Sequence, residues 1–207
     1  MNKIKNIVII GEKAIGKTTL ANALLGWDIF PQSSDDAYVP TEEVASQMLT
    51  DSVRLTDTPG YDSWWNHVPD DMVKAITQAD TVIVLLDEVL AEDGFFPSDD
   101  PDWEKHLLAE EALLQKLLEN TRDVFFVIPY DSRESPPEQY PPAQALRLAW
   151  EWFSSMSDHG DAGFFCIEPM KALIGAIEAD EEAITQSGIL PLKSALLRCD
   201  PLVRSHI

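Results

Sequence analysis

Eight residues near the start of the chain have the pattern of a phosphate-binding loop. The segment Gly11-Glu-Lys-Ala-Ile-Gly-Lys-Thr18 matches G-x-x-x-x-G-K-[ST], between an apolar run and a segment with helical spacing. Backbone N–H groups of such a loop wrap nucleotide phosphates, and the following helix adds its positive end. Lys17 would then bridge the β- and γ-phosphates, with the Thr18 hydroxyl on Mg²⁺. The expected nucleotide contacts here come from Gly11, Glu12, Lys13, Ala14, Ile15, Gly16, Lys17, Thr18 and Thr19.

A second short motif, Asp57-Thr-Pro-Gly60, follows the next apolar run, 40 residues beyond Lys17. An Asp at the end of a strand beside the phosphate loop can hold Mg²⁺ through a water, while the Gly60 N–H can meet the γ-phosphate. Alone, these four residues are also a common turn. Because they follow a phosphate loop, we interpret them as the second half of one nucleotide site.

Apolar runs alternate with helical spacing along most of the chain, which predicts a three-layer, doubly wound α/β fold with a mostly parallel sheet. Strands are predicted over Ile4–Ile10, Val53–Thr56, Thr81–Leu86, Val124–Ile128 and Phe164–Ile167. Helices are predicted over Lys17–Leu25, Asp70–Gln78, Asp100–Asn120, Ala143–Met156 and Leu190–Leu197. Thr41–Leu49 breaks the alternation and is expected to form an antiparallel edge strand, joined to Val53 through Thr50–Asp51. The whole chain, 1–207, is expected to be one domain, with a Pro-rich loop at 130–142 and a helical insertion at 168–187.

With both motifs present, the chain resembles the translation-factor-related small GTPases and, within them, the Era-like group with its D-T-P-G sequence. The resemblance implies a Ras-like G domain that binds GTP or GDP with Mg²⁺ and has two switch segments that report the γ-phosphate. Thr41 lies where the family keeps a switch I threonine that closes on Mg²⁺; a threonine at a strand start or turn is the other interpretation. The expected metal ligands are Thr18, Thr41 and Asp57, and the residues expected to act in hydrolysis are Lys17, Thr41 and Gly60.

The segments that recognise the base in this family differ here. In place of N-K-x-D the chain has Pro129-Tyr-Asp-Ser132, and in place of the S-A loop it has Cys166-Ile-Glu-Pro169. Asp131 could supply the acidic group from a shifted position and Tyr130 could stack on the base, or both could be solvent-facing loop residues. Guanine binding therefore rests on the resemblance.

The place that holds the family's catalytic Gln or His, directly after Gly60, is occupied by Tyr61. A tyrosine cannot orient water as an amide does, so we predict slow intrinsic hydrolysis, aided by His67, by a partner residue or by the substrate phosphate itself. Ala14 stands where potassium-activated relatives have Asn, so that mechanism of hydrolysis is not supported.

Trp64 and Trp65 lie in the expected switch II and could either anchor a partner or pack on the neighbouring helix.

The chain has 15 Lys and Arg against 36 Asp and Glu, a formal net charge of −21. Nucleic acid and anionic membrane are therefore unfavourable partners, whereas a basic protein surface is a favourable one. Two isolated cysteines, Cys166 and Cys199, make no disulfide framework and fit a cytoplasmic location. No apolar stretch approaches the roughly 20 residues of a membrane helix, which predicts no integral membrane association.

Three functions compete on this sequence. The leading hypothesis is an Era-like GTP-binding switch with slow hydrolysis that signals to a protein partner through Thr41 and the Asp57–His67 segment. A pseudo-GTPase acting as a regulatory or scaffold module is favoured by Tyr61 and by the missing N-K-x-D. An ATPase or nucleotide kinase is permitted because the phosphate loop does not recognise the base, but no Arg-rich lid is visible.

Overall fold

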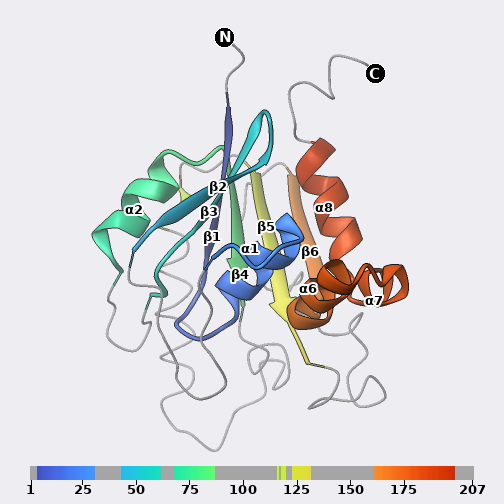
Figure 1. The fold of residues 1–207 in the computed structure, drawn as a ribbon. Helices are drawn as coiled ribbons and strands as arrows, with labels where there is room; N and C mark the ends of the chain where they lie inside the picture. Colours follow the sequence, from blue (N-terminus) through green and yellow to red (C-terminus); the bar gives the residue numbers. More distant parts are fainter. Residues whose placement is uncertain are drawn as a thin grey trace, which may run out of the picture.

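The described part of the molecule is built on a six-stranded sheet, which is drawn in Figure 1. The computed structural model describes residues 4–30, 43–61, 68–86, 116, 118–119, 123–131 and 161–198. The strands lie in the order β2-β3-β1-β4-β5-β6, and only β2 runs antiparallel to its neighbour. The predicted doubly wound, mostly parallel class with one antiparallel edge is therefore confirmed. The strands are β1 (Lys5–Ile10), β2 (Ala45–Thr50), β3 (Val53–Asp57), β4 (Thr81–Leu85), β5 (Asp123–Pro129) and β6 (Asp161–Ile167).

Helices cover both faces of the sheet because side chains alternate along each strand. On one face, α1 (Lys17–Leu25), α6 (Pro169–Glu178) and α8 (Ile189–Arg198) pack over Ile7 and Ile9 of β1. On the other face, α2 (Asp70–Thr77) packs over Val8 and Ile10. The short helix α7 (Glu181–Gln186) joins α6 to α8, so α6, α7 and α8 follow β6 in succession. They are drawn in orange and red in Figure 1.

Most predicted elements are present with small shifts at their ends. The helix predicted over Lys17–Leu25 has those bounds, and Gly26 ends it in the left-handed conformation at φ 79°. The final helix begins one residue earlier and ends one residue later than predicted. The last strand begins three residues before the predicted Phe164, because Asp161 already pairs with Asp123 of β5.

The predicted hairpin was wrong in its turn and in its first strand. Thr50 pairs with Val53, so the turn lies at Asp51–Ser52 and not at Thr50–Asp51. The register shifts between Met48 and Thr50, and this irregularity carries the strand one residue further than predicted. β2 begins at Ala45 rather than at Thr41, and residues 41–42 lie outside the described part.

Several predictions fall wholly or largely outside the described residues. These are the helix over Ala143–Met156, nearly all of the Pro-rich loop 130–142, and the helix over Asp100–Asn120 apart from a few residues near its end. Of the latter, Lys116 and Leu118 are helical, and Leu118 is buried. None of the helices in the described ranges has the length and apolar composition of a membrane span.

Candidate nucleotide-binding site

The phosphate loop connects the end of β1 to the start of α1. Three residues of this turn have positive φ: Gly11 at 155°, Ala14 at 65° and Gly16 at 94°. Backbone turns that alternate in this way present successive N–H groups to one side, which makes an anion-binding concavity. The Gly16 carbonyl accepts the first helical bond, from the Leu20 N–H at 2.9 Å, and α1 begins directly at Lys17. The loop therefore has the local structure that its sequence predicts.

The ammonium group of Lys17 lies within this loop. Its Nζ donates to the Glu12 carbonyl oxygen at 2.5 Å, and the side chain is 5% exposed. Burial lowers the pKa of Lys17 to about 8, although Asp57 and Glu12 act in the opposite direction. A buried cation with a lowered pKa is a site at which an added anion is stabilised.

Thr18 and Asp57 meet beside Lys17, as their motifs predict. The Thr18 Oγ1 donates to the Asp57 Oδ2 at 2.7 Å. Asp57 is 1% exposed, and burial raises its pKa, an effect that Thr18, Lys17 and the Thr58 backbone oppose. Its second oxygen, Oδ1, is buried without a hydrogen-bond partner.

A hydroxyl beside an unsatisfied carboxylate oxygen fits a hard cation such as Mg²⁺, which binds to proteins through oxygen ligands. Mg²⁺ commonly takes only one or two protein ligands and completes its shell with phosphates and waters. Consistent with that, the described ranges contain no cluster of three or more His, Cys, Asp or Glu side chains that could hold a metal unaided.

The Asp57–Gly60 segment is attached to the phosphate loop through the backbone. Tyr61 N–H donates to the Gly11 carbonyl and Lys13 N–H donates to the Tyr61 carbonyl, both at 3.2 Å. A Cβ on Gly60 would lie 2.5 Å from the Lys13 Cα, so only glycine allows this approach. Thr58 Oγ1 fixes the same segment to β1 by donating to the Ile9 carbonyl at 2.7 Å.

The Tyr61 side chain is completely buried in the apolar core beneath α2, with Val8, Ile10 and Met72 among its neighbours. The phenol is therefore enclosed by the protein. Burial therefore adds a structural reason, beyond the chemistry of a phenol, to expect that Tyr61 does not position water as a Gln would.

The other end of the site lies where β5 and β6 end. Tyr130 N–H donates to the Ile167 carbonyl at 2.9 Å, and Tyr130 and Asp131 are both half-buried. Burial raises the pKa of Tyr130, with a further contribution from Glu168. Pro169, the first residue of α6, has no N–H to offer to a base.

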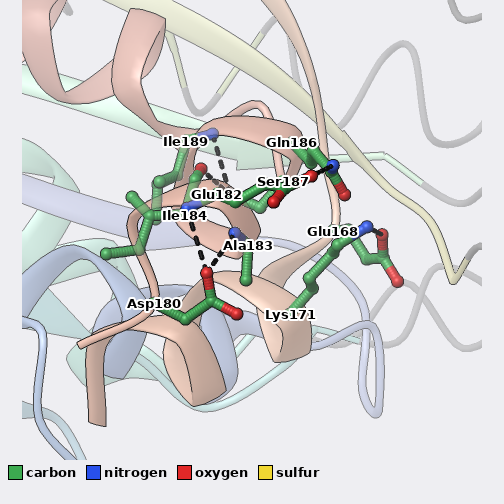
Figure 2. Close-up of polar contacts among 9 residues, drawn as sticks. All are labelled: Glu168, Lys171, Asp180, Glu182, Ala183, Ile184, Gln186, Ser187 and Ile189. Carbon is green, nitrogen blue, oxygen red and sulfur yellow. Dashed lines mark hydrogen bonds and ion pairs between the residues drawn. The ribbon is translucent and has the colours of Figure 1, made fainter. Parts of the chain in front are cut away.

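Glu168 is a buried carboxylate at this edge that the sequence analysis treated only as part of a replaced loop. It is 6% exposed, and its Oε2 lies 3.6 Å from the Lys171 Nζ, as Figure 2 shows. Its N–H donates to the Ser187 carbonyl at 2.9 Å, which closes the α6–α7 segment back onto the end of β6. The signal available in the sequence was a Glu-Pro pair directly after an apolar strand.

Because β1, β3, β5 and β6 are parallel, their carboxyl ends share one edge of the sheet, where ligands of open α/β sheets bind. The structure places the phosphate loop, Asp57 and Gly60 at one part of this edge, and Tyr130, Asp131 and Glu168 at another, beyond β4. Thr19 lies in the first turn of α1, and Ile15 packs against the core. Four other predicted residues lie outside the described part: Thr41, Trp64, Trp65 and His67.

Comparison with known proteins agrees with this architecture. A family model described as 50S ribosome-binding GTPase matches residues 6–129. Among curated proteins there is no match. Two similar solved structures are Era in complex with MgGDPNP and nucleotides 1506–1542 of 16S ribosomal RNA, at 18% identity and a TM-score of 0.51, and the bacterial selenocysteine-specific elongation factor EF-Sec, at 16% and 0.52.

These structures cover 90% and 89% of this chain, while the chain spans only 57% of the Era chain and 28% of the elongation factor chain. At such identities the likeness shows the fold, that of a Ras-like G domain. The family assignment rests on the matched model, which covers β1 to β5 with the phosphate loop and Asp57–Gly60. The chain therefore belongs to the 50S ribosome-binding GTPase family and has its P-loop, GTP-binding GTPase domain.

Proposed function

We propose that this protein is a Mg²⁺-dependent guanine-nucleotide switch that hydrolyses GTP slowly and signals to a protein partner. The observation that carries the proposal is the contact between Thr18 and Asp57 at 2.7 Å, with an unsatisfied Asp57 oxygen beside it and the Lys17 ammonium nearby. Thr18 and Asp57 would hold Mg²⁺, which when bound neutralises charge on the β- and γ-phosphates. When nucleotide binds, the Lys17 ammonium would leave the Glu12 carbonyl and donate to phosphate oxygens instead.

The proposed switch acts through the short backbone ladder between Gly11, Lys13 and Tyr61. Gly60 now lies closely against the Lys13 backbone, and a γ-phosphate that binds the Gly60 N–H must fit at this place. The two hydrogen bonds that connect Tyr61 to Gly11 and Lys13 are therefore expected to shift between nucleotide states. Together with the segment that includes Thr41, the stretch from Asp57 to His67 is the proposed contact for the partner.

A groove of about 310 Å³ beside these segments supports a protein partner. It lies between α2, which follows the switch segment, and the outer strands β2 and β3. Its walls carry the charged side chains of Arg54, Lys74 and Asp71 together with hydroxyl and amide groups, which suit a polar peptide. The family description names the ribosome and Era was solved with RNA, but the net charge of −21 favours contact with protein over contact with RNA here.

Slow hydrolysis follows from the burial of Tyr61, which leaves the reaction to Lys17, Mg²⁺, Gly60, Thr41 and the substrate phosphate. The second candidate, a pseudo-GTPase that binds nucleotide without turnover, is favoured by the same buried tyrosine and by the altered base end. Single-turnover hydrolysis separates the two, because a pseudo-GTPase leaves GTP intact over hours.

The test is a titration with labelled GTP, GDP and ATP, with and without Mg²⁺, followed by single-turnover hydrolysis of GTP. The proposal expects tighter binding of the guanine nucleotides and slow turnover. Tyr61→Phe, which keeps the ring in the core, should change the rate far less than the roughly 10²–10⁴-fold loss that follows removal of an acid–base group. Failure of all three nucleotides to bind refutes the switch, and a preference for ATP refutes the guanine assignment.

A further inference from the structure

Helix α6 has an exposed apolar stripe. Met170, Ile174 and Ile177 are 40%, 45% and 53% exposed, and their spacing of four and three residues places them on one face of the helix. The rest of the helix is already used for packing. Ala172 and Leu173 belong to the core, and Gly175 lies so close to α7 that a Cβ there would be 3.0 Å from the Ala183 Cβ. The stripe is thus a second apolar face of α6, separate from the one that packs on the core and on α7.

Trp27 lies just past the end of α1, the helix that packs against α6. It is 69% exposed and directly follows Gly26, whose added Cβ would lie 3.9 Å from the Ala176 Cβ of α6. The turn that carries Trp27 is fixed by one side chain, since the Asn22 Oδ1 accepts from the N–H groups of Ile29 at 3.1 Å and Phe30 at 2.8 Å. An exposed tryptophan on a fixed turn has the properties of a binding anchor.

Acidic side chains border this surface. Asp180 caps α7 by accepting from the N–H groups of Glu182 and Ala183, both at 3.0 Å, as Figure 2 shows. The one lysine of α6, Lys171, is directed at the buried Glu168. The surrounding field is therefore negative. The exposed carboxylates on these elements are Asp28, Glu178, Asp180, Glu181 and Glu182.

We infer that Trp27, Met170, Ile174 and Ile177, here called the α6 surface, dock a basic amphipathic helix of a protein partner. The apolar face of such a helix would cover the stripe while its lysines and arginines meet the carboxylates around it. An anionic membrane is repelled by those carboxylates, and so is a second copy of this chain, which carries the same charge. The inference does not depend on nucleotide binding.

The test uses a labelled synthetic helix of leucine and lysine, whose binding to the full chain is followed by fluorescence anisotropy. We expect saturable binding that Trp27→Ala weakens by about tenfold, as for an interface anchor. Ile174→Asp should also weaken it by about tenfold, even though this change makes the protein more negative. The matched control is Val73→Asp on α2, where an exposed valine is replaced in the same way and binding should be unchanged.

Ile174→Asp removes an apolar contact, which weakens binding of the basic peptide, and adds a negative charge, which strengthens it. Because these two effects have opposite signs, the result shows which of them dominates. If the Ile174→Asp protein binds the peptide as tightly as wild type or more tightly, attraction is purely electrostatic and the docking surface is refuted. Circular dichroism checks that α6 persists, and Ile174→Ala, which keeps helix propensity, should still weaken binding by about threefold. Two further outcomes overturn the choice of partner: a dimer that Ile174→Asp dissociates, or binding to anionic vesicles.

Discussion

The phosphate end and the base end of the candidate site occupy the same edge of one sheet, but they differ in how completely they are built. At the phosphate end, Lys17, Thr18 and Asp57 contact one another or the loop backbone within hydrogen-bond distance. At the base end, Tyr130 and Asp131 are half-buried, and the buried carboxylate of Glu168 lies 3.6 Å from the ammonium of Lys171. The phosphate end is preorganised for a ligand, while the described residues of the base end are polar groups that do not converge on one position for a base.

This difference suggests that binding energy comes mainly from the phosphates and Mg²⁺. Charge-assisted hydrogen bonds to phosphate are about twice as strong as neutral ones, whereas base selectivity needs a directed acid. Within the described residues, the phosphate loop is fixed by the backbone, through its conformation at Ala14 and Gly16 and its hydrogen bonds to Tyr61. Four predictions test the contrast.

Lys17→Ala should have the largest effect. It removes the buried ammonium that is proposed to contact two phosphates, and the loss of two charged hydrogen bonds should weaken GDP or GTP binding by about 100-fold or more. Isothermal calorimetry measures the dissociation constants of GDP and GTP for the variant and the wild type. Lys116→Ala is the control, because Lys116 is an exposed lysine outside the loop. A change of less than threefold for Lys17→Ala would show that the phosphate end does not dominate binding.

Thr18→Val should remove most of the Mg²⁺ dependence. The hydroxyl is lost at constant volume, and Asp57 loses its 2.7 Å hydrogen bond, so the factor by which Mg²⁺ tightens GDP binding should fall about tenfold to hundredfold. Thr18→Ser keeps the hydroxyl and should retain the factor. If Thr18→Val and Thr18→Ser respond to Mg²⁺ alike, the hydroxyl is not a ligand.

The same contrast marks what the sequence predicts and what it leaves open. The phosphate loop and β1, β3 and β4 were predicted closely because local rules define them: a glycine pattern, β-branched runs and a helix that starts at Lys17. The hairpin turn was misplaced by a register shift near Met48, which depends on pairing with β3 and not on local propensity. Two features depend on tertiary packing: the burial of Tyr61 beneath α2 and that of Glu168 beside α6 and Ser187. No sequence spacing could show them.

The pKa of Lys17 predicts how binding depends on pH. The phosphates bind the ammonium form, so a pKa of about 8 in the free protein should give full affinity below that pH and about tenfold weaker GDP binding at about pH 9 than at about pH 7. Lys17→Arg stays charged and should give a flat profile. The stability of the nucleotide-free protein should change with pH in the opposite direction to nucleotide affinity. Lys17 has a pKa near 10.5 in the unfolded chain and about 8 in the folded protein, so between these values the unfolded chain binds more protons. The free energy of unfolding therefore rises with pH in this range.

Asp131→Ala should have the smallest effect and tests the base end directly. If Asp131 accepts from the guanine edge at a half-buried position, its removal should lower the preference for GTP over ATP by about threefold to tenfold and leave the Mg²⁺ dependence unchanged. Glu168→Gln is the matched comparison, since it neutralises the other acid at this edge without changing its size. An unchanged preference in Asp131→Ala together with a loss in Glu168→Gln would move base recognition from the end of β5 to the end of β6. No change in either variant would mean that neither Asp131 nor Glu168 recognises the base.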